Sequence, residues 1–457
     1  MMIELRDYQK KAIQAFQSHN NRGILDMATG TGKTFTSIAC AEANFQMVKH
    51  QVLIILVPFI HLIPQWQENL TATGVHVDVK IAGNKTNWMQ KLQDQIWEYN
   101  HGLRDRLVII GSYVSTNKWE FNNLIKLLKR TEDVFLIADE CHYLGSRSSI
   151  NIISVYSSFG SVLGLSATPE RWWDEEGTNR IFNLFGGIIY EFSLAQAIDR
   201  GFLTPYNYYP IPVYLTIEEN EEYITLTKSI GKIYGQLLKN DDDSIREKYE
   251  YLLRKRTRVI QQAANKEIEL QKVFNKNNDK YNLLYCPDGQ IDKYTQLIGN
   301  KLNQSVVKFD SGLRLKKRTQ ILNKFELGEI KTLAAMKCLD EGVDVPQTRQ
   351  AYFLASTTNP RQFIQRRGRI LRNSAGKTQA NIYDFIVLPD VNEIDFDTAK
   401  VMVKREIPRF HEFCQYAKNE FEARNIVGPI LSKFDLDSYM DKSAIDIYNE
   451  NIQNEEK

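Results

Sequence analysis

Residues 27–34, Met-Ala-Thr-Gly-Thr-Gly-Lys-Thr, have the types and spacing that bind a chain of phosphates. Glycines allow successive backbone N–H groups to turn toward an anion. Lys33 would reach the β- and γ-phosphates of a nucleotide, and the hydroxyl of Thr34 would coordinate Mg²⁺. Met27 departs from the full pattern, because a glycine usually stands first. The predicted nucleotide-binding residues of this loop are Thr29, Gly30, Thr31, Gly32, Lys33 and Thr34.

A pair of carboxylates, Asp139 and Glu140, follows the apolar run 134–138. In phosphoryl transfer, one carboxylate at the end of a strand holds the Mg²⁺ that bridges the phosphates, and the next one polarises the attacking water. Two acids after an apolar run are also typical of a solvated loop. Their place after a phosphate-binding loop favours the catalytic interpretation, with Asp139 as metal ligand and Glu140 as general base.

Short apolar runs place these motifs at the ends of strands. Runs of this length that are rich in β-branched residues are typical of strands buried on both faces of a parallel sheet. Helical segments separate them, which predicts a doubly wound sheet that binds ligands at its carboxyl edge. The runs are 23–26, 52–58, 107–111, 134–138 and 162–165.

Length and composition describe an ordinary globular chain. Its 457 residues are enough for two or three domains, and 43% are hydrophobic while 25% are charged. The net charge of +2 does not by itself indicate nucleic acid, so such a partner must be argued from local patches. The five cysteines are scattered without a CxxC pair, which predicts a reducing compartment without structural zinc. The start lacks an apolar signal core and the most apolar run, 52–60, is too short to span a bilayer, so we expect a cytoplasmic protein and no membrane partner.

Four ordered motifs in the first half resemble those of the DExH-type helicases and translocases of superfamily 2. They are Gln9, 28–34 (ATGTGKT), 139–142 (DECH) and 166–168 (SAT). The second half supplies the rest: 283–286 resembles the strand that opens the second RecA-like domain, 340–346 (DEGVDVP) resembles motif V, and 365–372 (QRRGRILR) resembles motif VI.

The resemblance covers residues 5–388. Motifs V and VI are similar to those of the motor parts of type I and type III restriction enzymes and of the xeroderma pigmentosum B group. The DEAD-box RNA helicases are less similar, because their second motif ends in Asp where this chain has His142.

This resemblance implies an α/β fold of two RecA-like domains in tandem, each with a doubly wound parallel sheet. We expect the first domain at 1–206 and the second at 280–390. A helical insertion or arm is expected between them at 215–278, and a helical extension with a disordered tail at 391–457.

The resemblance also implies ATP and Mg²⁺ as cofactors. Lys33, Asp139, Glu140, Arg369 and Arg372 would be catalytic. Arg372 would be the finger that reaches across the cleft to charge developing in the transition state. By themselves, residues 365–372 are also typical of a basic surface helix. Further implied ATP-binding residues are Arg6, Gln9, Gly342 and Asp344, with Gln9 reading adenine, and the residues implied in coupling are His142, Ser166, Thr168 and Gln365.

Nucleic-acid contacts are predicted in three places. The first domain would contribute Pro58, Gln65, Ser112 and Tyr113, and the second Lys337. Met336 stands where many relatives have a threonine or valine, so a hydroxyl contact to phosphate is absent there and Lys337 would contact phosphate as a point charge. Trp66 is equally typical of a helix that packs on the sheet. By family analogy, DNA is a more expected partner than RNA.

The arm provides the third place. Apolar residues recur at helical spacing over 245–274, which predicts one or two long amphipathic helices. Arg254 and Arg258 would lie one turn apart, while Arg256 interrupts the apolar stripe. These arginines fit either a solvated face with ion pairs to neighbouring glutamates or a grip on the phosphates of duplex.

Several functions remain open on the sequence. The leading hypothesis is an ATP-dependent nucleic-acid translocase or helicase; the alternatives are an RNA helicase and the motor subunit of a restriction or defence system whose nuclease is a separate protein. An ATP-gated clamp and a P-loop kinase fit less well, given Glu140 and the second RecA-like half. Pro287-Asp288 with Glu329 and Lys331 spells a PD…ExK nuclease, but both segments belong to the ends of motor strands.

Overall fold

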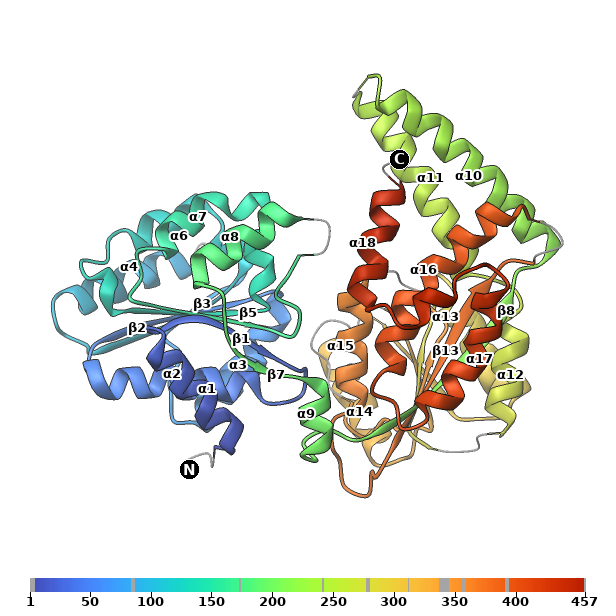
Figure 1. Cartoon of the computed structure of the whole chain (residues 1–457). Coiled ribbons are helices and arrows are strands. Elements are labelled where there is room, and N and C mark those ends of the chain that lie inside the picture. The colour runs from blue at the N-terminus through green and yellow to red at the C-terminus, as the bar shows by residue number, and fades with distance from the viewer. Residues whose placement is uncertain are drawn as a thin grey trace. The chain divides into compact units, whose positions relative to one another are not determined.

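The computed structural model describes residues 5–83, 87–171, 174–240, 242–276, 280–310, 312–336, 345–355, 359–390 and 394–455. The chain forms two compact units, unit 1 (Met1–Phe202) and unit 2 (Leu203–Lys457). Each unit contains a parallel sheet with helices on both faces (Figure 1). The predicted α/β fold with two doubly wound sheets is therefore confirmed.

The sheet of unit 1 has seven parallel strands in the order β3-β4-β2-β5-β6-β1-β7. Every residue of β2 is buried, and β5 is buried up to its last residue, as expected for strands covered on both faces. The strands are β1 (Arg22–Met27), β2 (Gln51–Val57), β3 (Val79–Ile81), β4 (Arg106–Ser112), β5 (Val134–Asp139), β6 (Ser161–Ser166) and β7 (Ile188–Phe192).

Nine helices of unit 1 have described bounds, and those labelled in Figure 1 cover both faces of the sheet. Helices α4, α6, α7 and α8 lie over one face, and α1, α2 and α3 lie over the other. The bounds are α1 (Asp7–Ser18), α2 (Lys33–Val48), α3 (Ile63–Ala72), α4 (Asn87–Asn100), α5 (Tyr113–Thr116), α6 (Trp119–Ile125), α7 (Ile150–Tyr156), α8 (Glu175–Phe185) and α9 (Leu194–Asp199).

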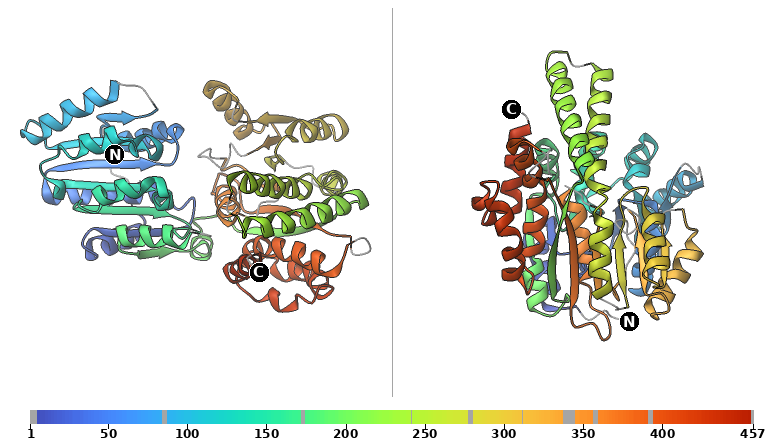
Figure 2. Two further views of the ribbon diagram at one scale, coloured as in Figure 1. Left: turned by 90° about the horizontal axis from the view of Figure 1, so that it is seen from above. Right: turned by 90° about the vertical axis from the view of Figure 1, so that its right-hand side faces the viewer.

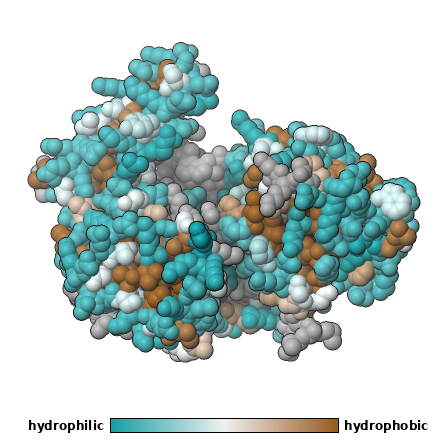
Figure 3. Space-filling model, turned by 180° about the vertical axis from the view of Figure 1, so that it is seen from behind, coloured by the Kyte–Doolittle hydropathy of each residue, from teal (hydrophilic) through white to brown (hydrophobic). Residues whose placement is uncertain are grey.

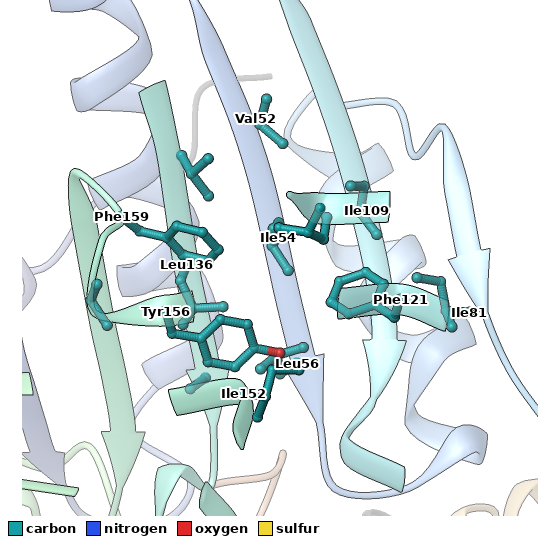
Figure 4. Close-up of a cluster of buried hydrophobic side chains, with 14 of the residues drawn as sticks. Val52, Ile54, Leu56, Ile81, Ile109, Phe121, Leu136, Ile152, Tyr156 and Phe159 are labelled. Carbon is teal, nitrogen blue, oxygen red and sulfur yellow. The ribbon is translucent and has the colours of Figure 1, made fainter. Parts of the chain in front are cut away.

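One apolar core fixes β2 relative to the helices. Figure 4 shows Ile54 and Leu56 of β2 facing Phe121 of α6 and Ile152 and Tyr156 of α7. All five side chains are fully or almost fully buried. Burying one such aliphatic or aromatic side chain stabilises the fold by roughly 1.5–3 kcal/mol. The carboxyl ends of the strands, where the chemistry-bearing motifs begin, are therefore held rigidly.

Unit 2 has six parallel strands in the order β10-β11-β9-β12-β13-β8. They are β8 (Tyr206–Tyr214), β9 (Asn282–Tyr285), β10 (Val306–Phe309), β11 (Thr332–Ala335), β12 (Gln350–Phe353) and β13 (Ala380–Leu388). Its helices are α10 (Ile217–Leu237), α11 (Asp243–Gln261), α12 (Lys266–Lys276), α13 (Ile291–Gln296), α14 (Leu315–Glu326), α15 (Pro360–Ile370), α16 (Phe396–Cys414), α17 (Glu420–Ser432) and α18 (Ala444–Glu455).

The boundaries differ from the predicted ones in two respects. Unit 1 ends at Phe202 instead of residue 206, and unit 2 opens with β8, which pairs with β13 along its whole length. The arm is therefore an insertion within unit 2, placed between its first two strands in sequence. The tail expected to be disordered forms α18, because Ile447 is fully buried and gives that helix an apolar side.

The arm is a pair of long helices. Helices α10 and α11 lie side by side as a hairpin that projects from unit 2, as Figure 1 and the right-hand view of Figure 2 both show. Ile230, Ile233 and Val259 are buried along their shared side. The range 245–274, for which amphipathic helices are predicted, spans most of α11 and α12.

The surface is mostly hydrophilic on the face drawn in Figure 3, with hydrophobic side chains in scattered patches. Small scattered patches are ordinary for a folded protein. Among the described residues, no helix combines the length and the apolar character needed to cross a bilayer.

Candidate functional site

The phosphate-binding loop leaves β1 and enters α2, whose first residue is Lys33. Gly30 and Gly32 have φ values of 90° and 85°, which are left-handed conformations that favour glycine. Met27 ends β1 in extended conformation and is fully buried, so this position does not require a glycine. The Nζ atom of Lys33 donates to the carbonyl of Met27 at 2.8 Å, which folds the side chain back along the loop. The loop thus joins a strand to a helix, as the sequence predicts.

Helix α1 supports this loop. The Oε1 atom of Gln9 accepts from the backbone N–H of Arg6 at 3.0 Å, and Nε2 donates to the hydroxyl of Thr36 at 3.2 Å. A Cβ atom on Gly32 would lie only 3.0 Å from Gln9 Nε2. The guanidinium of Arg6 lies over the ring of Phe202, 4.6 Å from its centroid. Gln9 therefore links α1 to α2 next to the loop, and its reading of adenine stays a prediction.

The carboxylate pair lies where β5 ends. Asp139 is its last residue, and Glu140 follows with a φ of 49°. A residue other than glycine in the left-handed region is strained, and such strain is frequent at functional sites. Nδ1 of the buried His142 lies 3.4 Å from Oε2 of Glu140. Asp139, Glu140 and His142 therefore lie together at the carboxyl edge of the sheet.

One tryptophan and one tyrosine side chain hold Asp139. The indole Nε1 of Trp66 donates to Asp139 Oδ2 at 3.0 Å, and the hydroxyl of Tyr113 donates to the Asp139 carbonyl at 2.7 Å. Burial and the charge of Glu140 raise the pKa of Asp139 to about 6, while the Trp66 hydrogen bond and Lys33 lower it. Lys33 of the loop is therefore near enough to Asp139 to act on its charge.

The SAT motif (166–168), here called motif III, begins at the last residue of β6, the strand between β5 and β1. Ser166 is buried, and its hydroxyl accepts from the backbone N–H of Thr168 at 3.0 Å. In the sheet register Ser166 is paired with Asp26. Burial raises the pKa of Asp26 to about 6, and the charge of Lys33 opposes that shift. Motif III thus lies beside the strand that carries the loop, and its role in coupling stays a prediction.

In unit 2, α15 separates the arginines of motif VI into two kinds. Arg366 is buried, with its guanidinium 4.9 Å from the centroid of the Tyr285 ring. Arg367 is also buried, and donates to the carbonyl and the carboxylate of Glu412. Arg369 is half-buried, as are Gln365 and Arg372. Two of the four arginines are thus structural parts of unit 2.

The backbone at Arg372 is fixed by Lys377. The Nζ atom of Lys377 donates to the carbonyls of Ile370 and Arg372, the latter at 2.9 Å, and to that of Pro346 at 3.0 Å. Arg372 also forms an isolated bridge with Leu203. The segment that carries the predicted finger is therefore held at several points within unit 2.

Comparisons with known protein families cover both units. Residues 2–171 match the family described as type III restriction enzyme, res subunit, and residues 265–374 match the helicase conserved C-terminal domain. Together the two matches contain the loop, the DECH and SAT motifs and motif VI. The chain thus carries helicase domains of the superfamily 2 type. It is therefore an ATP-hydrolysing motor of the helicase type.

Individual relatives agree with this assignment. The DNA 3'-5' translocase XPB2 of Sulfurisphaera tokodaii is 28% identical over 393 residues, which are 81% of this chain and 79% of that protein. The type ISP restriction-modification enzyme LlaBIII, solved bound to DNA, superposes with a TM-score of 0.62 at 16% identity over 96% of this chain. The chain spans only 33% of that enzyme. The helicase domain of Hef from Pyrococcus furiosus superposes with a TM-score of 0.53 at 16% identity, covering 85% of this chain and 96% of that domain's chain.

The donor atoms of this superfamily 2 motor suit Mg²⁺. Mg²⁺ prefers oxygen ligands and usually binds through one or two protein groups together with phosphates and water. Thr34 at the start of α2 offers a hydroxyl and Asp139 a carboxylate. Among the residues that the structure describes, the buried Oγ1 of Thr29 and Oε2 of Glu140 have no hydrogen-bond partner, so the site has polar capacity for a ligand. Among the described residues, no group of three or more His, Cys, Asp or Glu side chains forms a separate metal site.

The residues predicted to contact nucleic acid in unit 1 differ in exposure. Gln65 on α3 is exposed, whereas Pro58 at the end of β2 is buried. Ser112 and Tyr113 are buried, and the Ser112 hydroxyl donates to Ser115 Oγ at 2.9 Å. Their side chains therefore have internal partners, and their contact with nucleic acid stays a prediction.

The arm arginines also have defined surroundings. Arg254 is exposed and pairs with Glu250 at 3.2 Å, and Arg258 is exposed four residues further along α11. Arg256, which interrupts the apolar stripe, is buried with its guanidinium 5.8 Å from the centroid of the Tyr223 ring on α10. The aliphatic part of the Arg256 side chain thus takes the place of an apolar residue in the arm, whereas Arg254 and Arg258 lie on its surface.

Some predicted positions lie outside the described residues. These are Lys337, Gly342 and Asp344 of motif V. The nuclease-like residues are separated by the fold, because Asp288 follows the carboxyl end of β9 whereas Glu329 precedes β11, its parallel neighbour. Asp288 and Glu329 therefore lie at opposite ends of two neighbouring strands, which agrees with rejecting a PD…ExK site.

The sequence did not predict the contacts that three supporting residues make. Tyr8 bonds to the loop, Trp66 bonds to Asp139 of the carboxylate pair, and Lys377 holds the backbone of Arg372. Trp66 had a signal, because it directly follows Gln65, a predicted nucleic-acid contact. Tyr8 had the same kind of signal beside Gln9. Lys377 had no such signal in the sequence, because its contacts depend on the path of the backbone after α15.

Proposed function

We propose that this chain couples ATP hydrolysis to movement along DNA. The observation that carries the proposal is the arrangement of Lys33, Asp139 and Glu140 at one edge of the first sheet, with Glu140 in a strained conformation. A clamp that only binds ATP has no need of a general base held in this way. The helicase domains support movement on nucleic acid, and the similarity to the DNA 3'-5' translocase XPB2 supports DNA.

The residues present can perform the ATPase reaction. Lys33 and the N-terminal amides of α2 would bind the phosphates, and Thr34 and Asp139 would hold Mg²⁺, which neutralises charge on the phosphate oxygens. Glu140 would take the proton from the attacking water. Arg369 and Arg372 would stabilise charge that develops only in the transition state.

A second candidate is the motor subunit of a restriction or defence system. The likeness to LlaBIII favours it, because this chain matches one third of that larger enzyme. In that case another protein or domain would cut the DNA. A pull-down from the native host, followed by a nuclease assay with and without ATP, distinguishes this candidate from a motor that acts alone.

Steady-state ATPase measurements test the leading proposal. Turnover is measured alone and with single-stranded DNA, duplex DNA and RNA of equal nucleotide concentration. We expect either form of DNA to raise turnover more than RNA does. Stimulation by RNA alone would replace the proposal with an RNA helicase, and no stimulation by any nucleic acid would favour a clamp.

A triplex-displacement assay then tests movement. A motor that tracks along duplex removes a third strand placed ahead of it, and it does so only when ATP is hydrolysed. The Glu140→Gln variant serves as control, because we expect it to bind ATP without turnover. Displacement by that variant would show that binding alone removes the strand.

A further inference from the structure

Two helices of unit 1 reach the same catalytic residue. Trp66 on α3 donates from its indole nitrogen to the Asp139 carboxylate at 3.0 Å. Tyr113 on α5 donates from its hydroxyl to the Asp139 carbonyl at 2.7 Å. Both donors are 3% exposed. Because bulk water does not compete for these bonds, each of them restricts Asp139 more than a surface hydrogen bond would.

The strand order produces this convergence. β2 lies between β4 and β5 in the sheet, so the segments that follow β2 and β4 emerge at the same edge as Asp139. The segment after β2 forms α3, and the segment after β4 forms α5. These are also the segments whose exposed side is proposed to meet nucleic acid, and Gln65 beside Trp66 is exposed.

The Trp66 bond acts on the orientation of the carboxylate. A carboxylate can turn about its Cα–Cβ and Cβ–Cγ bonds, and a donor bound to Oδ2 fixes the direction in which Oδ1 points. Partners of this kind, one step removed from a metal, set the geometry of the ligand that binds it. The indole of Trp66 is well suited because its ring is held in the interior and its N–H has one direction.

Stacked rings continue from Asp139 toward the surface. Tyr113 stacks on Tyr143 with centroids 5.7 Å apart and planes at 13°. Tyr143 meets Phe59 edge to face at 5.9 Å, and Phe59 stacks on His61 at 5.5 Å. His61 is exposed in the short segment between β2 and α3. Closely packed rings transmit displacement because they cannot compress.

We propose that Trp66 is a positioning residue for Asp139, and that α3 transmits nucleic-acid binding to the ATPase site through this indole. The inference rests on the proposed function, because it takes α3 to lie against nucleic acid. Movement of α3 would shift the indole N–H relative to Oδ2 and turn the carboxylate that would hold Mg²⁺. Nucleic acid then raises turnover without touching ATP.

The Trp66→Phe variant tests the positioning role. It removes the N–H donor and keeps an aromatic ring in the same space. Trp88→Phe is the matched control, because Trp88 is a buried tryptophan of the apolar core on α4 in the same unit. The affinity of a fluorescent ADP analogue is measured with and without Mg²⁺. Mg²⁺ should raise the affinity for the ADP analogue, and we call this increase the gain from Mg²⁺. We expect the gain to be roughly tenfold smaller in Trp66→Phe than in the wild type. The affinity measured without Mg²⁺ should stay the same.

In this measurement the control should behave as the wild type. Equal gains from Mg²⁺ in Trp66→Phe, Trp88→Phe and the wild type would overturn the positioning role. Tyr113→Phe, which removes a single hydroxyl group, gives an independent variant of the same arrangement. It should shift the gain in the same direction, and it remains informative if Trp66→Phe does not fold.

The transmission is tested by the ratio of ATPase rates with and without duplex DNA. We expect this ratio to fall several-fold in Trp66→Phe and to stay unchanged in Trp88→Phe. Trp66→Phe could show a reduced gain in nucleotide affinity from Mg²⁺ together with a wild-type ratio of ATPase rates. That result would overturn the transmission and leave Trp66 a positioning residue. If the wild type itself is not stimulated by any nucleic acid, the proposed function and the transmission both fail. The nucleotide-binding measurement still decides whether Trp66 positions Asp139.

Discussion

The phenol hydroxyl of Tyr8 donates to the main-chain carbonyl of Thr31 at 2.6 Å. The ring of Tyr8 lies flat on Phe192 of β7, with centroids 4.1 Å apart and planes at 2°. Helix α1 and strand β7 thus hold the phosphate-binding loop by its backbone. A loop that must present successive N–H groups to an anion benefits from such support, because its glycines are otherwise free to rotate.

Removal of this hydroxyl group should weaken nucleotide binding. Tyr8→Phe keeps the stacked ring but leaves the Thr31 carbonyl without its donor, at a cost of about 1 kcal/mol. We expect the dissociation constant for ATP to rise about fivefold. Binding of a fluorescent nucleotide measures this, with Tyr156→Phe as control for loss of a buried hydroxyl group elsewhere in unit 1. Equal affinities of wild type and Tyr8→Phe would show that the loop holds its shape alone.

The chemistry itself is tested at Lys33 and Glu140. Lys33→Ala should abolish ATP hydrolysis, because the γ-phosphate loses the charge that neutralises it. Glu140→Gln should bind ATP normally and slow turnover by roughly 10²-fold or more, since the amide cannot accept the proton from water. Single-turnover hydrolysis separates the two effects. Near-normal turnover in Glu140→Gln would remove Glu140 from the role of general base.

Much of unit 1 was predictable because its motifs are local. Strands such as 52–58 and 134–138 are continuous apolar runs, and a parallel sheet buried on both faces produces this pattern. The loop and the carboxylate pair follow their strands directly, so sequence order alone placed them at one edge. The contact of Trp66 with Asp139 was not predictable, because it depends on β2 lying next to β5.

Strand β8 shows where sequence patterns fail in unit 2. Pro210 and Pro212 argue against a strand, because proline cannot donate to a ladder. β8 is nevertheless a strand because it lies at the edge of the sheet. The backbone N–H and carbonyl of Tyr208 bond to the side chain of Asn419 at 2.8 and 3.0 Å. Residues two apart direct their N–H groups to the same side, so both prolines face this open edge and cost no ladder bond.

The arginines of motif VI should separate by function. Arg372→Ala should lower kcat by roughly 10³-fold with little change in nucleotide affinity, as expected for a finger that acts in the transition state. Arg367→Ala should instead destabilise unit 2 by about 3–5 kcal/mol, because it leaves the buried contacts to Glu412 unmet. Thermal melting and steady-state kinetics measured on both variants distinguish these outcomes. A change in affinity alone would make Arg372 a binding residue.

Lys266 makes the stability of unit 2 depend on pH. It is fully buried at the start of α12 and donates to the carbonyls of Ile260, Gln261 and Leu354. Burial lowers its pKa from 10.5 to about 7. Of the charges that act on it, Glu406, Asp384 and Glu219 raise the pKa and Arg409 lowers it.

Between pH 7 and 10.5 the unfolded chain therefore holds a proton that folded Lys266 lacks. The free energy of unfolding should rise with pH across this window, and below pH 7 the full cost of burying the ammonium group remains. Lys266→Met should lose this rise. Hydrogen exchange of β12 amides, compared between the wild type and Lys266→Met from pH 6 to pH 9, measures the difference. Parallel pH curves for the two proteins would show that buried Lys266 keeps its proton throughout.

The arm offers the last test. Arg254 and Arg258 lie one turn apart on the exposed side of α11, and the pair of Arg254 with Glu250 is exposed on both partners. An exposed ion pair contributes little, so Arg254 can exchange Glu250 for a phosphate at low cost. If both arginines bind phosphate, Arg254→Ala with Arg258→Ala should weaken duplex binding similarly for any sequence. The slope of log affinity against log salt should also fall by about one unit per lost contact.

A matched pair of charges controls for general electrostatics. Lys129 and Arg130 are exposed and lie just before β5, at the amino edge of the first sheet, away from the edge that carries the motifs. Their double replacement by alanine removes the same charge and should leave the salt slope unchanged. Basal ATP turnover should stay at the wild-type value in both double variants, since neither pair lies among the ATPase residues. Equal salt slopes for the two double variants would show that Arg254 and Arg258 do not bind phosphate. The arm would then be a packing element whose arginines face solvent, as the exposed ion pair of Arg254 with Glu250 indicates.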